Sequence, residues 1–314
     1  MSELAHIYPN DRITLREVGL RDGLQLVKTW PDTDAKRDWL RCEHAAGVRH
    51  FEIGSFLPSR HFPQFGDVHE IIAAGAALNG AHSAALALNE RGLDDAIHTA
   101  VGEIVCVISA TEEHSQANMR RSRDEAIGLV RKAVALRDTE APGKIINAGI
   151  AMAFGCSISG HVDQREVIRL SEACLAAGAD IVGLADTVGY AGPRQVGALS
   201  KTMERLCGER PFAIHLHDTR GMGIANAAAA IDNGARVLDA SLGGLGGCPF
   251  APGATGNVVF EDLVFLCETM GFATGIDISA LKKARAVAEH SMPGEPFYGA
   301  LAKAGPPANL KWSA

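Results

Sequence analysis

The chain has 314 residues, of which 47% are hydrophobic, so it is long and apolar enough to bury the core of one large domain. Its formal net charge of −7 argues against a general nucleic-acid-binding surface and against binding to anionic membranes. The seven cysteines are scattered and never spaced as Cys-x-x-Cys, which indicates reduced thiols rather than a disulfide framework or a zinc knot.

Apolar, β-prone segments alternate with amphipathic segments along most of the chain. The predicted strands are residues 13–18, 48–53, 83–88, 103–108, 145–152, 180–184, 212–216 and 237–241. The predicted helices lie near residues 34–46, 66–78, 90–100, 122–137, 163–177, 193–206, 222–233 and 257–270. This alternation predicts an α/β fold, a closed (β/α)8 TIM barrel. A doubly wound open sheet is the alternative, and the lack of Gly-x-Gly-x-x-Gly after the first strand disfavours it.

The end of the chain differs in composition from the predicted barrel. Residues 276–314 are helix-prone to about Glu289 and then rich in proline and glycine. We therefore expect a catalytic barrel over residues 1–275 and a C-terminal helical appendage over residues 276–314 that packs on it. The first residues carry no apolar signal segment, and no apolar run approaches the roughly 18 residues of a membrane span. These features predict a cytoplasmic protein without a membrane partner.

Polar side chains gather where the predicted strands end. Active sites of (β/α)8 enzymes lie at the C-terminal ends of the strands, which brings residues from distant segments to one mouth. The polar residues at these positions are Arg21, Asp22, Glu52, Asp186, His215, His217, Cys248 and Asn257. The last two lie in residues 239–257, where six glycines and two prolines predict a loop that folds over a ligand rather than a surface linker.

His215 and His217, separated by one leucine, form the most specific local pattern in the chain. Side chains alternate along a strand, so these two imidazoles point to one face, with Cα atoms about 7 Å apart. They are interpreted as metal ligands, the alternative being core histidines satisfied by hydrogen bonds. Asp22 and Asn257 offer oxygen atoms that complete such a site. Imidazole and oxygen donors without a thiolate favour Mg²⁺ or Mn²⁺ over structural zinc.

Arg21 and Cys248 each have two interpretations. Arg21 either stabilises an enolate oxygen as a fixed cation or forms a salt bridge across the barrel with a carboxylate such as Glu52. Cys248 stands between Gly247 and Pro249, which favours an exposed proton donor over a small buried hydrophobic residue. The pattern of residues leaves the role of Arg21 open.

Three motifs resemble those of the hydroxymethylglutaryl-CoA lyases, which belong to the DRE-TIM metallolyases. They are Glu17-Val-Gly-Leu-Arg-Asp-Gly-Leu-Gln25, His215-Leu-His-Asp-Thr219 and Ser241-Leu-Gly-Gly-Leu-Gly-Gly-Cys-Pro-Phe250. The resemblance spans about residues 13–275. It implies metal ligation by Asp22, His215, His217 and Asn257, substrate contacts by Arg21 and Gln25, a polar site with Glu52 and Asp186, and Cys248 as the acid on the loop.

The resemblance also implies a reaction, a retro-Claisen cleavage of a 3-hydroxy-3-methyl acyl-CoA. With 3-hydroxy-3-methylglutaryl-CoA the products are acetyl-CoA and acetoacetate, as in leucine degradation. The divalent cation would acidify the tertiary hydroxyl, a base would remove its proton, and Cys248 would protonate the acetyl-CoA enolate. The alternatives are the same chemistry on citramalyl-CoA or a longer 3-hydroxyglutaryl-CoA, the forward reaction of related synthases, and a non-catalytic barrel.

Departures from the family pattern leave the acyl group open. They are Leu26-Val27-Lys28 after the first motif, Ser157 after Gly155-Cys156, and Gly183-Leu-Ala-Asp186 in the sixth strand. For the CoA phosphates, the basic run from Asn118 to Arg123 places Arg120 and Arg121 at the start of a predicted helix. The sequence does not decide whether the chain forms a homodimer or a higher homo-oligomer.

Overall fold

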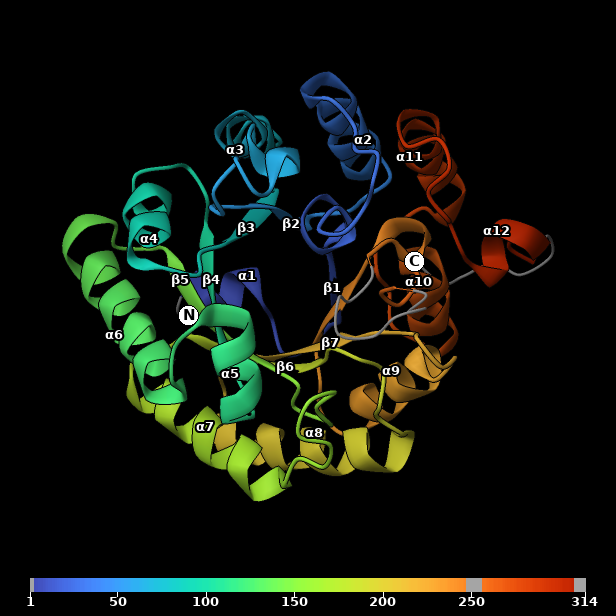
Figure 1. The fold of residues 1–314 in the computed structure, drawn as a ribbon. Helices are drawn as coiled ribbons and strands as arrows, with labels where there is room; N and C mark the ends of the chain where they lie inside the picture. The colour runs from blue at the N-terminus through green and yellow to red at the C-terminus, as the bar shows by residue number, and fades with distance from the viewer. Residues whose placement is uncertain (1–2, 247–255, 308–314) are drawn as a thin grey trace.

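Eight parallel strands close into a barrel in the computed structural model of the protein, which describes residues 3–246 and 256–307. Each strand pairs with the next in the chain, and β8 pairs with β1 (Figure 1). The strands are β1 (Thr14–Glu17), β2 (His50–Ser55), β3 (His82–Leu86), β4 (Glu103–Ser109), β5 (Ile145–Ala151), β6 (Ile181–Asp186), β7 (Phe212–Leu216) and β8 (Val237–Ala240). The predicted (β/α)8 barrel is confirmed, and each predicted strand overlaps an observed one.

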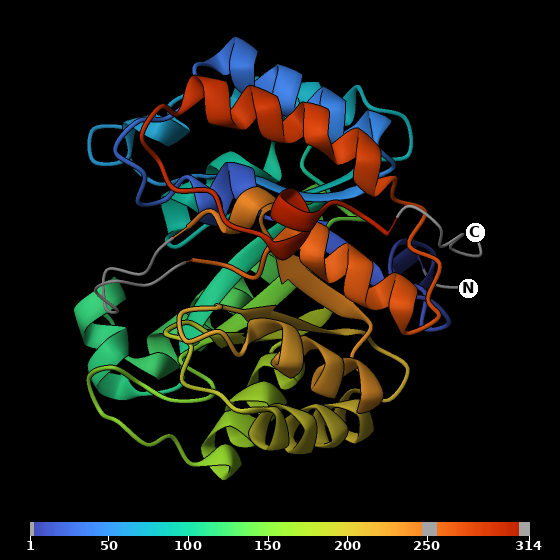
Figure 2. The same ribbon diagram turned by 90° about the vertical axis from the view of Figure 1, so that its right-hand side faces the viewer.

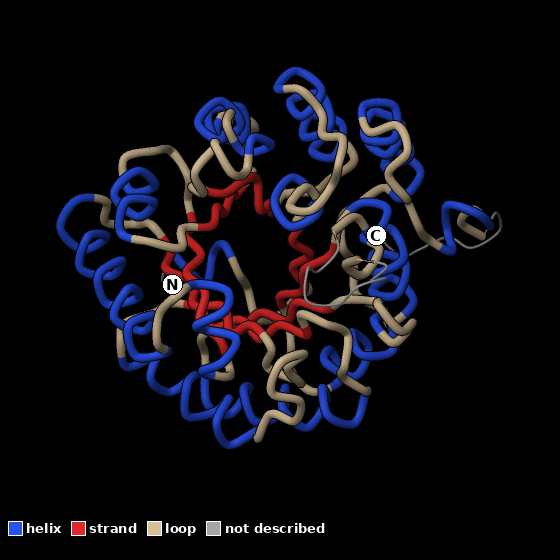
Figure 3. The backbone as a smooth tube through the Cα atoms, viewed as in Figure 1, coloured by secondary structure: helices blue, strands red, loops and turns tan. Residues whose placement is uncertain are grey.

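Helices surround this ring of strands, as Figure 3 shows with helices in blue outside strands in red. Those that overlap predicted helices are α2 (Thr33–Ala45), α3 (Val68–Ala76), α4 (Glu90–Ile97), α6 (Arg123–Glu140), α7 (Gln164–Ala176), α8 (Pro193–Cys207), α9 (Gly223–Asp232) and α10 (Phe260–Thr269). Several of these helices are capped at their N-termini by a side-chain oxygen that accepts a backbone hydrogen bond. Asn89 accepts a hydrogen bond from Gly92 N at α4, and Ser122 forms a capping box with Glu125 at α6.

One helix at the barrel mouth has no counterpart among the predicted elements. This helix, α5 (Glu112–Met119), follows β4 and is almost entirely polar, with the sequence EEHSQANM. Without an apolar period of about 3.6 residues, the usual sign of an amphipathic helix is missing. Thr111 still caps its first turn through a hydrogen bond from His114 N to Thr111 Oγ1.

The N-terminal end of the barrel is closed by the short helix α1 (Glu3–Ile7) and by Tyr8. Tyr8 is buried and packs with apolar residues at the starts of four strands, Ile145, Ile181, Ala213 and Val237. Its hydroxyl donates a hydrogen bond of 2.5 Å to Glu103 Oε2 inside the barrel. Because this end is filled, access to the interior comes from the opposite end.

Charged residues occupy the middle of the barrel instead of a purely apolar filling. Arg16 donates to both oxygens of Asp239, at 2.7 and 3.0 Å, and to Glu103 Oε1 at 2.7 Å. Burial alone would raise the pKa of Glu103, but the charge of Arg16 and hydrogen bonds from neighbouring side chains lower it to about 2. These paired charges form the floor beneath the barrel mouth.

The last described segment packs on the outside of the barrel. Helix α11 (Ile278–Ser291) contacts α2 and α10, and Figure 2 shows it lying beside α2. Its Arg285 pairs with Glu261 of α10 at 3.0 Å. A final helix, α12 (Ala300–Ala304), contacts α10. The division at residue 275 into a barrel and an appendage stays a prediction.

Among the described residues, none of the helices combines the length and the apolar character that a membrane crossing requires.

Candidate metal centre and active site

A cavity of about 280 Å³ opens at the C-terminal ends of the strands. Predicted site residues that line it are Arg21, Asp22, Gln25, Glu52, His215 and His217. His114 also lines it, a residue with no predicted role because it lies on α5, which has no counterpart among the predicted helices. The structure therefore brings residues from β1, β2 and β7 into one space, as the barrel rule predicts.

Asp22, His215 and His217 form the cluster that can hold a metal ion, with one ligand atom of each lying within 4.8 Å of the others. The two Nε2 atoms of the histidines are 3.1 Å apart. Asp22 Oδ2 lies 3.4 Å from His217 Nε2 and 3.9 Å from His215 Nε2. Asp22 sits on η1 (Gly19–Gly23), the short helical turn after β1, which aims it across the mouth at β7.

These spacings fit a small divalent cation. Two ligands at about 2.1 Å from an octahedral ion and at right angles to each other lie about 3.0 Å apart. Burial alone would raise the pKa of Asp22, but the Arg21 charge and a hydrogen bond with His217 hold it well below its usual value. An ionised carboxylate beside two imidazoles is the donor set that a hard or borderline cation accepts.

Asn257 lies against the same cluster, but its amide nitrogen faces Asp22. Nδ2 donates to Asp22 Oδ2 and to Leu245 O, both at 2.8 Å. Oδ1 is buried and has no hydrogen-bond partner among the described residues. The structure thus brings Asn257 to the predicted site and leaves its oxygen ligand role a prediction.

Asp239 of β8 contacts the metal-ligand cluster through His215, and no role was predicted for it from the sequence. Its Oδ2 lies 3.2 Å from His215 Nδ1, while Arg16 binds both of its oxygens. Metal-bound histidines are commonly oriented by such a partner on the second ring nitrogen. The sequence did contain a signal for Asp239, because it is a charged residue within a predicted apolar strand. A carboxylate buried there needs a partner, which indicates a paired or functional residue.

Arg21 is fixed by two carboxylates. Its guanidinium lies 2.7 Å from Glu52 Oε2 and 2.5 Å from Asp22 Oδ1, and it donates to Gln25 Oε1 at 3.3 Å. The salt bridge to Glu52 that sequence analysis offered as one interpretation is therefore present. Arg21 also lines the cavity, so the salt bridge does not remove this residue from the mouth.

Asp186 lies at the end of β6 and holds the backbone of the loop that leads to α8. Its two carboxylate oxygens accept hydrogen bonds from Tyr190 N at 2.8 Å and from Ala191 N at 3.1 Å. Burial raises its pKa, opposed by these backbone donors. Asp186 is not among the residues that line the cavity, so its predicted catalytic role stays a prediction.

The remaining predicted residues lie apart from the cluster or outside the described chain. Arg120 is the left-handed residue that ends α5, and Arg121 follows it in the link to α6 rather than inside a helix. Neither lines the mouth cavity. Cys248 falls in residues 247–255, outside the described residues.

The chain is similar to known proteins over most of its length. The HMGL-like family model matches residues 12–288 of the chain. The hydroxymethylglutaryl-CoA lyase YngG of Bacillus subtilis is 34% identical over 290 residues, covering 92% of this chain and 96% of that protein. The (R)-citramalyl-CoA lyase of Chloroflexus aurantiacus is 36% identical over 307 residues, covering 94% and 96%.

Solved structures agree with these sequences. An HMG-CoA lyase from Acinetobacter baumannii, solved in complex with coenzyme A and 3-methylmalate, superposes with a TM-score of 0.87 at 35% identity, covering 96% of this chain and 98% of that one. The carboxyl transferase domain of Rhizobium etli pyruvate carboxylase, at 18% identity and a TM-score of 0.67, shares the fold alone.

Proposed function

Since this chain belongs to the HMGL-like family, we propose that it is a metal-dependent carbon–carbon lyase that cleaves an acyl-CoA thioester. The preferred substrate is 3-hydroxy-3-methylglutaryl-CoA, cleaved to acetyl-CoA and acetoacetate. The observation that carries the proposal is the convergence of Asp22, His215 and His217 beside Arg21 at the barrel mouth. With this reaction the chain would act in leucine degradation, in the cytoplasm.

Asp22, His215 and His217 would hold the cation, with Asn257 as a fourth ligand through Oδ1. A bound Mg²⁺ or Mn²⁺ would act as a Lewis acid on substrate oxygens and favour loss of the hydroxyl proton. The donor set of imidazoles and oxygens, with no thiolate among the three clustered residues, supports these two cations over structural zinc.

Arg21 would stabilise the oxygen that gains negative charge as the carbon–carbon bond breaks. Its guanidinium is already held by Glu52 and Asp22, so it needs no reorganisation when that charge develops. Burial raises the pKa of Glu52, and the adjacent Arg21 opposes that rise. Cys248 would then supply the proton that converts the enolate of acetyl-CoA into product.

Asp239 would act as a positioning residue for His215. A carboxylate on Nδ1 fixes the imidazole so that Nε2 faces Asp22 and His217. Arg16 lies between this carboxylate and that of Glu103 and balances part of their buried negative charge. The ligand cluster is therefore set on a rigid polar floor within the barrel.

Citramalyl-CoA is the second candidate substrate. The citramalyl-CoA lyase relative is slightly more identical, at 36%, than the hydroxymethylglutaryl-CoA lyase YngG, at 34%. Both candidate thioesters carry a 3-hydroxyl group and release acetyl-CoA by the same retro-Claisen cleavage. A longer 3-hydroxyglutaryl-CoA is the third candidate, because the family motifs do not restrict the acyl group.

The test is acetyl-CoA release from a panel of these three thioesters, with Mg²⁺, with Mn²⁺ and after treatment with a chelator. We expect cleavage of 3-hydroxy-3-methylglutaryl-CoA with the highest kcat/KM, abolished by chelation and restored by adding either cation. Faster cleavage of citramalyl-CoA would change the assigned substrate and leave the assigned reaction, retro-Claisen cleavage, unchanged. Metal-independent cleavage, or no cleavage of any member, would overturn the proposal.

A further inference from the structure

Gly243, in the loop that follows β8, is held at both of its backbone hydrogen-bonding groups by residues outside the ring of strands. Gly243 N donates to Glu261 Oε2 of α10 at 3.0 Å. Tyr298 N, in the segment between α11 and α12, donates to Gly243 O at 2.7 Å. None of these three residues lines the mouth cavity, and the proposed reaction gives them no role.

Arg285 of α11 joins the two partners of Gly243. Its Nη1 atom donates to Glu261 Oε1 at 3.0 Å and to Tyr298 O at 2.7 Å. The contacts form a closed ring from Gly243 N through Glu261, Arg285 and Tyr298 back to Gly243 O, which we call the Gly243 clamp. The side chains of Arg285 and Glu261 are 14% and 8% exposed, so water competes little for their ion pair. Helices α10, α11 and α12 lie together on one side of the barrel (Figure 1).

The conformation of Gly243 lets the C-terminal segment approach closely. Its backbone is left-handed, with φ 62° and ψ 12°, which glycine adopts without strain. A β-carbon on this residue would lie 2.4 Å from Cδ1 of Phe297. The Arg285 guanidinium lies over the same ring, 5.5 Å from its centroid. The clamp therefore holds the loop by its backbone and packs a ring against it.

The clamped loop reaches the candidate metal ligands two residues after Gly243. Leu245 O accepts hydrogen bonds from Ser241 Oγ at 2.6 Å and from Asn257 Nδ2 at 2.8 Å. The same Nδ2 atom donates to Asp22 Oδ2 at 2.8 Å. The position of Leu245 O therefore helps to fix the plane of the Asn257 amide, whose Oδ1 is the predicted fourth ligand.

We propose that Arg285 is a positioning residue for the metal centre and acts through Gly243 and Leu245 on Asn257. This inference rests on the proposed function, because it requires a divalent cation at the cluster. Without Arg285, Glu261 Oε1 and the carbonyl of the C-terminal segment lose their common donor, and the loop that fixes Asn257 loses its outer support. Residues that orient metal ligands commonly change metal affinity about 10- to 100-fold. The C-terminal helices would then serve the active site.

The test is isothermal titration calorimetry with Mn²⁺ on the full chain. Arg285→Gln should lower Mn²⁺ affinity about tenfold, the lower end of that range, because the link to the ligand is indirect. Arg285→Lys keeps a charged donor for Glu261 and Tyr298 and should recover most of the affinity. Asn257→Ala keeps the three clustered ligands and should bind Mn²⁺ weakly. In that background Arg285→Gln should cause no further loss, because the proposed link ends at Asn257.

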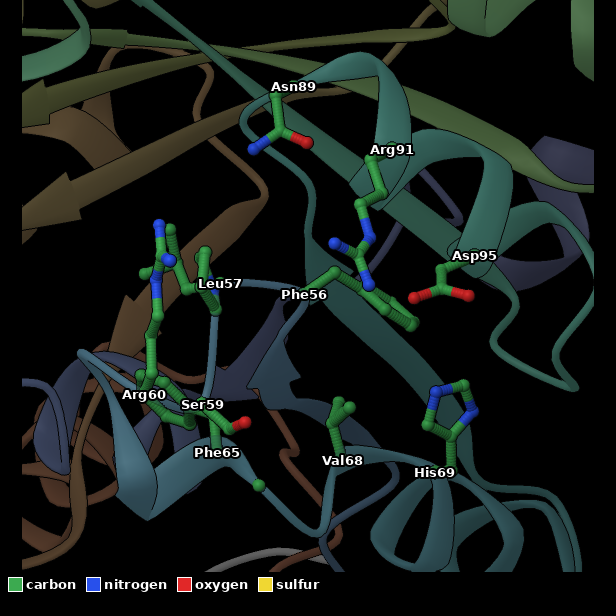
Figure 4. Close-up of a pocket in the computed structure, with 12 residues that line it drawn as sticks. Phe56, Leu57, Ser59, Arg60, Phe65, Val68, His69, Asn89, Arg91 and Asp95 are labelled. Atoms are coloured by element: carbon green, nitrogen blue, oxygen red, sulfur yellow. The ribbon is translucent and has the colours of Figure 1, made fainter.

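Two other arginines are controls for the loss of one positive charge. Arg236 lies over the Phe272 ring at 5.5 Å and donates to backbone carbonyls, as Arg285 does, but it precedes β8 at the end of the barrel away from the mouth. Arg91 lines a separate cavity of about 420 Å³, formed by the segment after β2 and the starts of α3 and α4 (Figure 4). Arg236→Gln and Arg91→Gln should keep wild-type Mn²⁺ affinity.

Wild-type Mn²⁺ affinity in Arg285→Gln would overturn the inference, and so would an equal loss in the wild-type and Asn257→Ala backgrounds. If thermal melting shows that Arg285→Gln does not fold, Glu261→Gln breaks the same ring of contacts and should lower the affinity in the same direction.

Hydrogen–deuterium exchange without a cation separates these results from failure of the proposed function. The amide of Gly243 should exchange faster in Arg285→Gln than in the wild type, because its acceptor Glu261 loses the ion pair. Unchanged exchange would show that Arg285 does not hold the loop and would overturn the inference. A wild type that binds no Mn²⁺ would overturn the proposed metal centre, and the positioning role with it, whatever the exchange shows.

Discussion

His215 Nδ1 lies 3.2 Å from Asp239 Oδ2, so the imidazole is held from the side opposite its candidate metal-binding nitrogen. Replacing Asp239 with asparagine weakens this support and reduces the charge that balances Arg16. We expect Asp239→Asn to lower Mn²⁺ affinity about 10- to 100-fold, the usual loss when such a supporting carboxylate is removed. Isothermal titration calorimetry measures the Mn²⁺ affinity of the wild type and of the variant.

The matched control for this variant is Asp180→Asn. Asp180 also pairs with an arginine, Arg137, at 2.6 Å, but it lies away from the mouth cavity. This variant should keep wild-type Mn²⁺ affinity. Equal losses in the two variants would mean that Asp239 acts only through overall stability.

His217 is predicted to be indispensable for cation binding. Its side chain is 3% exposed, and its Nε2 atom lies 3.4 Å from Asp22 Oδ2 and 3.1 Å from His215 Nε2, so alanine would remove one of the three clustered donors. His217→Ala should reduce Mn²⁺ binding below detection and abolish activity, while circular dichroism stays unchanged. His98→Ala, on the surface, is the control. Wild-type affinity in His217→Ala would remove this residue from the ligand set.

The barrel itself could be predicted from the sequence because its strands are buried on both faces. Such strands form continuous apolar runs, and the predicted strand at residues 145–152 matches β5 (Ile145–Ala151) within one residue. Helix α5 could not be predicted in this way, since a polar helix over the barrel mouth has no apolar face to bury.

The candidate site could be predicted only in part. Alternation along one strand was enough to place His215 and His217 on the same face, and the structure brings Asp22 to them. The contact between Asp239 and His215 depends on the register of β7 and β8, which pairs these two residues and is not encoded in local spacing. The hydrogen bonds that Asp186 accepts from Tyr190 N and Ala191 N likewise depend on the loop that follows β6.

Cys248 remains the predicted proton donor, although it lies outside the described residues. A thiol with an ordinary pKa of about 8.5 is protonated at neutral pH and able to donate. Cys248→Ser should lower kcat about 10²- to 10⁴-fold, the range typical of general acid catalysis, and leave Mn²⁺ affinity unchanged. Steady-state kinetics on the preferred substrate measures kcat, and calorimetry with Mn²⁺ measures the affinity for the cation. A kcat close to wild type would exclude Cys248 from the mechanism.

The final prediction concerns a buried acid, Glu17, that joins two loops of the mouth. Its Oε1 accepts hydrogen bonds from Gly19 N and Leu242 N, both at 2.9 Å. These donors belong to the loop with the candidate ligand Asp22 and to the loop after β8. Burial, opposed by the two backbone donors and reinforced by Glu261, raises the pKa of Glu17 to about 8 from an ordinary 4.5.

This shift makes stability depend on pH in a defined direction. Between about pH 4.5 and pH 8, Glu17 is ionised in the unfolded chain and protonated in the folded one. The folded state then binds more protons, so the free energy of unfolding falls as pH rises. The contribution of Glu17 is complete below pH 4.5, falls by at most about 1.4 kcal/mol per pH unit, and is lost above about pH 8.

Glu17→Gln should flatten this decline, because the amide keeps an oxygen for Gly19 N and Leu242 N but cannot ionise. Urea unfolding at intervals from pH 4.5 to pH 8.5 measures the slope in wild type and variant. Glu70→Gln, at an exposed position on α3, is the control and should keep the wild-type slope. Burial, and then the charge of Glu17, also raise the pKa of the neighbouring acid Glu43, so part of the slope should persist in the variant. A slope identical to wild type in Glu17→Gln would show that Glu17 is ionised in the folded protein.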